Sequence, residues 1–343
     1  MTRAPRALRG ALRWALALAA LSFVAWMVPV RDRCTDLRCE PGLASALAGA
    51  RLAALGGLLA VYALGTLLWA ARWRVLLRLA GVELSLGYVW RVSIEAQAGG
   101  VLLPGGIGGD ALRIASVAAR APSGGAPPPL ALVVASVMLD RAVGLAIVTA
   151  MASALAFAWG GGLRAGPLAV GLSAVPVALV CGVAVMRGRA VGRLRSRLDG
   201  PRGAALRSMI DYVRPPGAPR AIAAAAALSL GVAATQFAAI RGLVWALHAT
   251  PAAEKWIYLG TAMAFVVSAV PALPGAWGTA DAAYVFFFGL AGVGAGTALA
   301  VCLLFRLFWY ISAVTGAILH LARPRSRPAP ASARAGAAPE PPA

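Results

Sequence analysis

Six long apolar runs divide the chain into alternating hydrophobic and polar stretches. They cover 12–30, 52–71, 130–159, 167–186, 221–247 and 298–321. A helix needs about 20 predominantly apolar residues to cross the hydrocarbon core of a bilayer, and each run meets or approaches that length. The pattern therefore predicts an all-α polytopic membrane protein with about six full spans.

Two further apolar stretches, 86–119 and 256–293, are each interrupted by a Pro-Gly break. The breaks are Leu103-Pro-Gly-Gly-Ile-Gly-Gly-Asp110 and Leu273-Pro-Gly-Ala-Trp-Gly-Thr-Ala-Asp281. One arm of each stretch is too short to cross a bilayer comfortably. We predict two re-entrant helical hairpins, the first entering from the cytoplasm and the second from outside. Two full crossings in each stretch would leave the rest of the topology unchanged, so both readings stay open.

The order of these elements repeats. Residues 12–159 read as span, span, hairpin, span, and residues 167–321 repeat that order from the opposite side of the membrane. This is the pattern of an inverted-topology repeat, which in transporters places the substrate near the midplane of the membrane between broken helices. We expect residues 1–322 to form a single membrane domain.

Composition and charge support this interpretation. The chain is 60% hydrophobic and 13% charged, and its mean hydropathy is +0.78, values that exclude an ordinary soluble enzyme. Its net charge of +20 comes from arginines grouped beside the apolar runs, which favours contact with anionic lipid over nucleic-acid binding. Arginine-rich loops favour the cytoplasmic side of a membrane, so the distribution of the arginines predicts the topology. It predicts a cell-membrane protein with both termini cytoplasmic, a basic cytoplasmic segment at 187–220 and a disordered cytoplasmic tail at 323–343.

Cysteine and histidine usage limits the chemistry. Cys34 and Cys39 share a loop predicted to face outward, where a disulfide can form, although the sequence does not decide whether it does. We expect Cys181 and Cys302 to be core residues. With two histidines in the chain and no Cys/His cluster, we expect no metal site and no cofactor.

The Pro-Gly breaks carry the candidate binding chemistry. Glycines around a helix start expose backbone N–H groups that attract anions, and an arginine one turn later adds a charged donor. Asp110 either caps that helix or balances an arginine. The first break lacks the Lys-Ser/Thr ending of a nucleotide-binding loop, so ATP hydrolysis is not expected. The candidate residues at the two breaks are Gly105, Gly106, Gly108, Gly109, Asp110, Arg113, Gly275, Gly278 and Asp281.

Charged residues inside the predicted spans are the other candidates, because each costs a few kcal/mol at the bilayer centre unless it is paired or hydrated. They are Asp140, Arg141, Arg241 and Arg306. One reading makes them buried ion pairs that fix helix packing. The other makes the arginines a binding site for a lipid phosphate, with the aspartates and Glu95 balancing charge when the site is empty.

These motifs together resemble the transmembrane region of the lysylphosphatidylglycerol synthase family, over nearly the whole chain. The resemblance rests on Arg72-x-Arg74, the first Pro-Gly break through Arg113, Asp140-Arg141, the second break through Asp281, and Arg306. The family commonly has an asparagine where this chain has Gly99, Gly100 and Val101, and a glutamate where it has Asp281.

The resemblance implies a flippase-like protein that moves a lipid with an anionic or polar headgroup across the cytoplasmic membrane, such as an aminoacyl-phospholipid or a lipid-linked sugar. We expect membrane lipids as partners, with a separate lipid-modifying enzyme as a further candidate partner. No aminoacyl-transfer domain follows the spans in this sequence, so we expect no catalytic residues. The alternatives are a membrane enzyme or accessory subunit in glycolipid or aminoacyl-lipid synthesis, and a lipid-binding scaffold.

Overall fold

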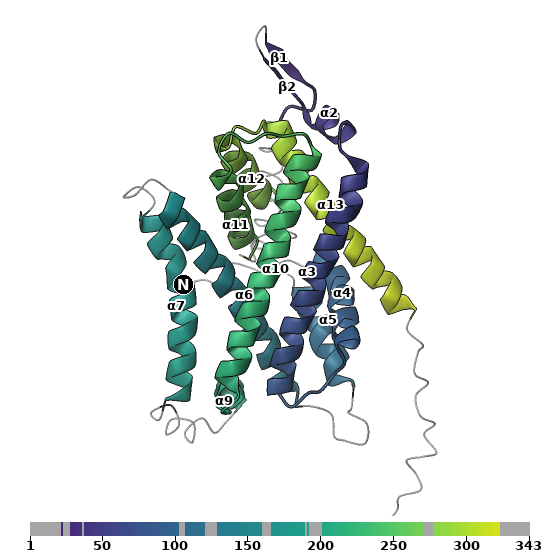
Figure 1. Ribbon diagram of the computed structural model, residues 1–343. Coiled ribbons are helices and arrows are strands. Elements are labelled where there is room, and N and C mark those ends of the chain that lie inside the picture. The colour runs from purple at the N-terminus through teal and green to yellow at the C-terminus, as the bar shows by residue number, and fades with distance from the viewer. Residues whose placement is uncertain are drawn as a thin grey trace, which may run out of the picture.

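The computed structural model is a bundle of long helices with shorter helices packed between them (Figure 1). It describes residues 22, 28–35, 38–102, 107–120, 129–159, 166–188, 191, 201–269 and 277–322. Most of the first predicted span lies outside these residues. So do both Pro-Gly corners, the tail from 323, and 189–190 and 192–200 of the predicted basic segment.

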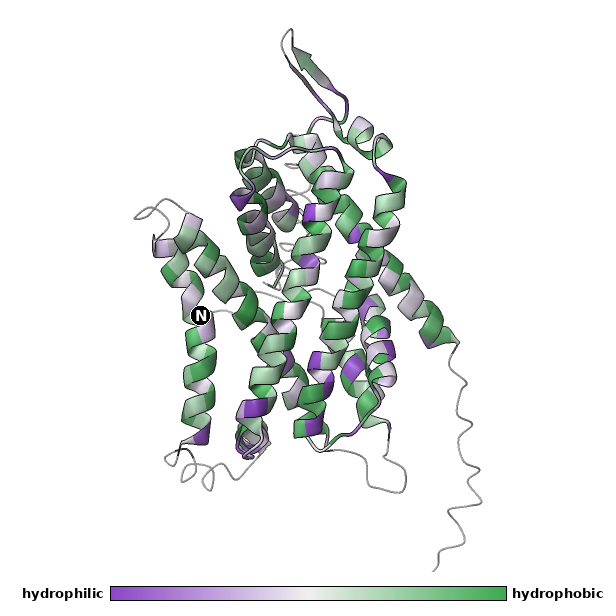
Figure 2. Cartoon of the chain, in the orientation of Figure 1, coloured by the Kyte–Doolittle hydropathy of each residue, from purple (hydrophilic) through white to green (hydrophobic). Residues whose placement is uncertain are grey.

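Five helices in the described part of the chain are long and apolar enough to cross a membrane. They match the five remaining predicted spans, which confirms the membrane fold class. Hydrophobic residues predominate along their length, and hydrophilic residues gather mainly toward their ends (Figure 2). The helices are α3 (Leu52–Leu79), α6 (Leu130–Trp159), α7 (Gly166–Arg187), α10 (Ala218–Ala246) and α13 (Ala295–Leu321).

Two pairs of short helices occupy the predicted hairpin positions. They are α4 (Leu86–Leu102) with α5 (Ile107–Ala118), and α11 (Lys255–Ala269) with α12 (Thr279–Leu290). The members of each pair pack against each other. A 12-residue helix such as α5 or α12 spans about 18 Å, well short of a hydrocarbon core about 30 Å thick. These lengths fit re-entrant hairpins better than full crossings.

The hairpins enter from opposite ends of the bundle, α4–α5 in its lower half and α11–α12 in its upper half (Figure 1). The two halves also exchange contacts reciprocally. Helix α4 packs on α13 of the second half, α11 packs on α6 of the first half, and α3 packs along its counterpart α10. Such reciprocal packing is what an inverted repeat predicts.

The two main apolar clusters each contain residues from both halves of the chain. One cluster of buried side chains, which includes Trp73, Val89 and Val143, surrounds the first hairpin, and the other, which includes Ile240 and Phe288, surrounds the second. The space between the two clusters is therefore where polar side chains from both halves can meet.

The ends of the bundle carry small additional elements. At the upper end, β1 (Arg33–Thr35) and β2 (Arg38–Glu40) form an antiparallel hairpin, followed by α2 (Leu43–Ala48). Cys34 lies opposite Cys39 in this ladder and is disulfide-bonded. Cys302 is buried as expected, but Cys181 is exposed on α7, because that helix turns most of its surface away from the protein.

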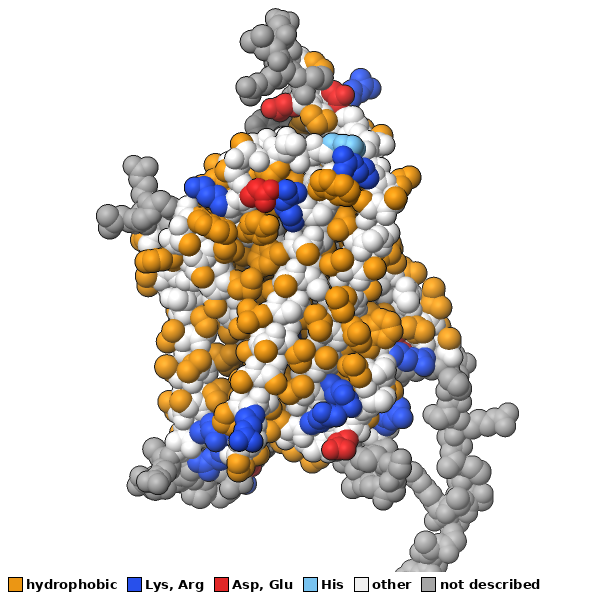
Figure 3. Space-filling view, in the orientation of Figure 1, with side chains coloured by type: hydrophobic (Ala, Val, Ile, Leu, Met, Phe, Trp, Pro, Cys, Tyr) orange, Lys and Arg blue, Asp and Glu red, His pale blue; other side chains and the backbone are white. Residues whose placement is uncertain are grey.

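At the lower end, α9 (Pro201–Val213) lies within the predicted basic segment. It docks on the bundle because Ile210, Tyr212 and Val213 are buried, and the Tyr212 hydroxyl donates to the Leu76 carbonyl at 2.7 Å. Basic side chains gather around this end of the molecule, whereas acidic and basic groups mix at the β-hairpin end (Figure 3).

Candidate functional site

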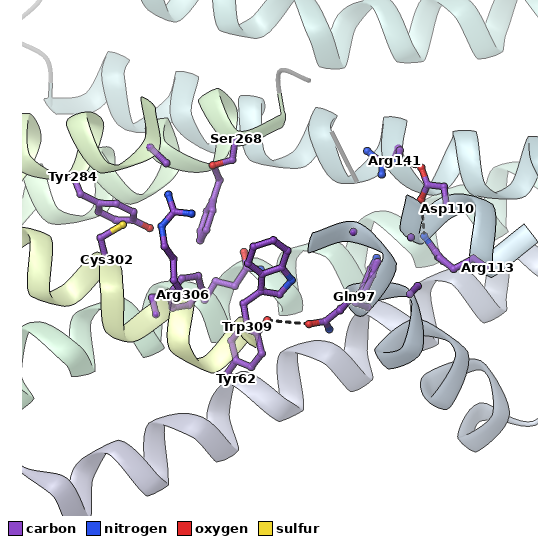
Figure 4. A pocket seen from close by; sticks show the side chains of 18 residues that line it. Tyr62, Gln97, Asp110, Arg113, Arg141, Ser268, Tyr284, Cys302, Arg306 and Trp309 are labelled. Atoms are coloured by element: carbon purple, nitrogen blue, oxygen red, sulfur yellow. Dashed lines mark hydrogen bonds and ion pairs between the residues drawn. The ribbon is translucent and has the colours of Figure 1, made fainter. Parts of the chain in front are cut away.

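A cavity of about 370 Å³ lies between the two hairpins. We call it the central cavity. Both hairpins contribute to its wall, together with α3, α6, α10 and α13. Figure 4 shows the charged groups of the first half at one end and those of the second half at the other. The charged residues in its lining are Asp110, Arg113, Arg141 and Arg306.

The first half supplies a buried ion network centred on Asp140. Its carboxylate accepts hydrogen bonds from Arg72 Nε at 2.7 Å and from Arg113 Nη2 at 3.0 Å. Asp140 and Arg113 are each 1% exposed. Arg72 also donates to the Ser229 hydroxyl on α10 at 3.0 Å, so the network ties α3, α5, α6 and α10 together. A charge this deeply buried needs such partners because its desolvation costs several kcal/mol.

Asp110 extends this network to the cavity surface. Its carboxylate forms an ion pair with Arg141 and lies 3.8 Å from Arg113 Nη1. The Arg141 side chain is 44% exposed, whereas the Arg113 side chain is 2% exposed. Arg113 is therefore the buried cation of this end, and Arg141 is the more accessible one.

Two tryptophans hold Arg113 in place. The guanidinium carbon lies 3.9 Å from the ring centroid of Trp73 and 5.0 Å from that of Trp69. Trp73 is fully buried and donates to the Ser136 hydroxyl at 3.2 Å. Tryptophans near span ends commonly mark the membrane interface, but these two face the interior because Arg113 attracts their ring faces.

The second half supplies a smaller network around Asp281. Its carboxylate accepts from Arg306 Nη2 at 3.0 Å, from the Gly278 backbone N–H at 2.8 Å and from the Cys302 thiol at 2.7 Å. Gly278 precedes α12 with φ of +81°, a conformation that favours glycine. Asp281 therefore both caps α12 and pairs with an arginine. Trp277 covers Arg306, with 4.3 Å between the guanidinium carbon and the ring centroid.

The two hairpins share an aspartate at the start of their second helix, and the residue three positions later lines the cavity in both. Asp110 and Asp281 each lie in the first turn of the second helix of their hairpin. Three residues later, Arg113 and Tyr284 both line the central cavity. Tyr284 was not among the residues predicted from the sequence, although its three-residue offset from Asp281 matches that of Arg113 from Asp110.

The glycines of the first break have a packing role. Gly108 and Gly109 lie inside α5 in helical conformation. A Cβ at Gly109 would lie 2.5 Å from the Ala96 carbonyl oxygen, and one at Gly99 would lie 2.9 Å from the Gly108 carbonyl oxygen. These glycines let α4 and α5 approach closely. Gly105, Gly106 and Gly275 lie outside the described residues.

Two predicted residues lie away from the cavity. Arg241 pairs with Glu254 near the β-hairpin end, where the two side chains are 31% and 46% exposed. Glu95 is fully buried, but it receives a hydrogen bond from Arg91 at 3.0 Å and lies 3.3 Å from His320 Nδ1, facing α13. Neither belongs to the cavity lining.

A second cavity of about 330 Å³ adjoins the first between α3, α6 and α10. It reaches Arg72 and Ser229 of the first network. The five residues that line both cavities are Tyr62, Trp69, Gln97, Gln236 and Trp309. Within the described ranges, no group of three or more His, Cys, Asp or Glu residues is placed to hold a metal ion.

A known family model matches most of the chain. The model of the family described as the lysylphosphatidylglycerol synthase TM region covers residues 14–316 of this chain. The chain belongs to this family. The match confirms the resemblance drawn from the Pro-Gly breaks and the intramembrane charges. No curated protein and no solved structure matches the chain. As a lysylphosphatidylglycerol synthase TM region with several apolar helices, it is a multi-pass membrane protein related to lipid modification or transport.

Proposed function

We propose that this protein is a flippase-like transporter that moves a lipid with an anionic headgroup across the cytoplasmic membrane. The observation that supports this most is the central cavity, in which arginines from both inverted halves, Arg113, Arg141 and Arg306, face one space. Inverted-repeat transporters bind their substrate between their halves, so that rocking of the halves exposes it to either side.

The charge of the site indicates the kind of headgroup. The two networks contain four arginines, Arg72, Arg113, Arg141 and Arg306, and three aspartates, Asp110, Asp140 and Asp281. They therefore carry one net positive charge. A phosphodiester carries one negative charge and would neutralise it, which matters because an uncompensated charge inside a bilayer is costly.

The geometry also suggests how the headgroup enters. Asp140 pairs with the buried Arg72 and Arg113, whereas the more exposed Arg141 pairs with Asp110 at the cavity surface. We infer that the lipid phosphate replaces Asp110 as the partner of Arg141. A cavity of about 370 Å³ suits a small headgroup, so the acyl chains stay in the surrounding bilayer.

We assign the α9 end of the bundle to the cytoplasm. Arginines concentrate in the described residues at that end, among them Arg74, Arg78, Arg187 and Arg214, and basic residues favour the cytoplasmic side. This orientation agrees with the predicted cytoplasmic termini. It lets the first hairpin enter from the cytoplasm and the second from outside.

The test is lipid transfer in reconstituted vesicles. Purified protein is placed in vesicles containing fluorescent phosphatidylglycerol, and the loss of fluorescence after a membrane-impermeant quencher is added reports movement between leaflets. Arg141→Gln is expected to slow transfer about tenfold or more, the effect of losing one charge-assisted contact. Arg241→Gln is the matched control, because Arg241 is also a partly exposed arginine in an ion pair with a carboxylate, but it lies outside the cavity.

Two results would reject the proposal. One is wild-type protein that moves phosphatidylglycerol no faster than protein-free vesicles do. The other is wild-type transfer by a folded Arg141→Gln variant. A synthase reaction receives less support from these contacts, because acid–base catalysis needs carboxylates around the reacting bond. Asp281 is not among the residues that line the cavity, and Asp110 is paired with Arg141.

A further inference from the structure

Tyr284 has a buried hydroxyl group without a hydrogen-bond partner. The residue is 3% exposed, and its hydroxyl oxygen bonds to no other group in the described part of the chain. Tyr284 nevertheless lines the central cavity, and Figure 4 shows it reaching from α12 toward Cys302 and Arg306. Buried hydroxyl groups are normally hydrogen-bonded because leaving one unpaired costs free energy. This hydroxyl is therefore a candidate for a ligand contact.

The neighbouring acceptor is already occupied by other donors. Asp281 receives Arg306, the Cys302 thiol and the Gly278 N–H. The Tyr284 hydroxyl takes no part in this network. The Tyr284 hydroxyl is thus an unused hydrogen-bond donor near the Arg306 guanidinium group.

The first half of the protein has a matching spare donor. Arg113 Nε is also buried without a hydrogen-bond partner among the described residues, while both Nη atoms of the same side chain face carboxylates. Arg113 and Tyr284 occupy equivalent positions, three residues after Asp110 and Asp281, and both line the cavity. Each inverted half thus has, at an equivalent position in the cavity lining, an N–H or O–H donor that is unpaired within the described residues, which fits a ligand rich in acceptor oxygens.

We propose that Tyr284 and Arg306 form a second phosphate-binding station, through which the headgroup phosphodiester passes after leaving Arg113 and Arg141. At this station the Tyr284 hydroxyl donates a hydrogen bond to a phosphate oxygen and Arg306 supplies the charge. The inference rests on the proposed function, since it describes where the transported phosphate binds near the second hairpin. Two stations related by the inverted repeat give the phosphate a partner in either half of the bilayer.

The decisive variant is Tyr284→Phe, which removes the hydroxyl group and keeps the ring. Tyr310→Phe is the matched control, because Tyr310 lies on α13 and lines neither cavity. Both variants are tested in the full chain for transfer of fluorescent phosphatidylglycerol in vesicles. They are also tested in detergent for the increase in Tm caused by the soluble headgroup glycerophosphoglycerol.

We expect Tyr284→Phe to lose about ten- to a hundredfold in transfer rate and in headgroup affinity, the range for a hydrogen bond to a charged group. Without ligand its Tm should equal or exceed that of the wild type, because a buried unpaired hydroxyl has been removed. Tyr310→Phe should match the wild type in transfer and headgroup binding. If the Tyr284 hydroxyl only stabilised the fold, Tyr284→Phe would instead have a lower Tm than the wild type in the absence of ligand.

The two readouts separate this inference from the proposed function. If the wild type transfers lipid and Tyr284→Phe transfers and binds equally well, the second station is wrong and the transport proposal stands. If the headgroup binds in a Tyr284-dependent way but no lipid moves, the station is right and transport is wrong. Absence of both transfer and headgroup binding in the wild type rejects both.

Discussion

Asp140 offers the sharpest test of the buried ion network. Asp140 is 1% exposed, and its carboxylate forms ion pairs with Arg72 at 2.7 Å and with Arg113 at 3.0 Å. Asp140→Asn keeps the shape of the side chain but removes its charge, so that two buried guanidinium groups lose their shared counter-ion. Breaking a buried pair in this way costs about 3–5 kcal/mol.

The expected loss is visible in thermal unfolding. At roughly 2–4 °C per kcal/mol for a large domain, the Tm of Asp140→Asn in detergent should fall by about 6–20 °C. Asp110→Asn is the comparison, because the Arg141 side chain that pairs with Asp110 is 44% exposed, and such a pair contributes only about 1 kcal/mol or less. The drop for Asp140→Asn should therefore be several times larger.

A second substitution tests whether unpaired guanidinium groups cause the loss of Tm. Adding Arg72→Gln to Asp140→Asn removes one of the two uncompensated cations and should recover part of the lost Tm, which double-mutant analysis measures directly. If Asp140→Asn unfolds at the wild-type temperature, or falls no further than Asp110→Asn, Asp140 is not the counter-ion that holds this network.

Two further predictions concern packing and pH. Gly316→Ala should destabilise the protein by about 1–3 kcal/mol, because the added Cβ would lie 2.2 Å from the Ile94 carbonyl oxygen. Gly289→Ala is the control, because its Cβ would meet open space, and it should leave the Tm unchanged or raise it. Equal Tm values for the two variants would contradict the close contact of α4 and α13. The hydrogen bond from Arg241 lowers the pKa of Glu254, so its contribution to stability is present above the ordinary glutamate pKa of about 4.3 and is lost as pH falls through the lowered value. Arg241→Gln should reduce this acid dependence of the Tm, and an unchanged profile would show that the pair contributes nothing.

The sequence by itself determined which segments enter the membrane and where the repeat lies. Long apolar runs and the Pro-Gly breaks are local signals, so the described spans, such as α6 and α10, and the two hairpins followed from composition and length. Asp140 and Arg306 also needed no tertiary information to be recognised as candidates, because a charge within an apolar run is costly wherever it points.

The tertiary structure alone decided which partner each charged group has. Pairing depends on how each helix is rotated and which neighbour it meets, and these properties come from packing of the whole bundle. That is why Arg113 and Arg72 share Asp140 and why Arg241 turns to Glu254 on the surface. It is also why Tyr284 lines the cavity while its hydroxyl has no partner among the described residues. Sequence pattern places a charge at a depth in the membrane, but only the fold places it against another residue.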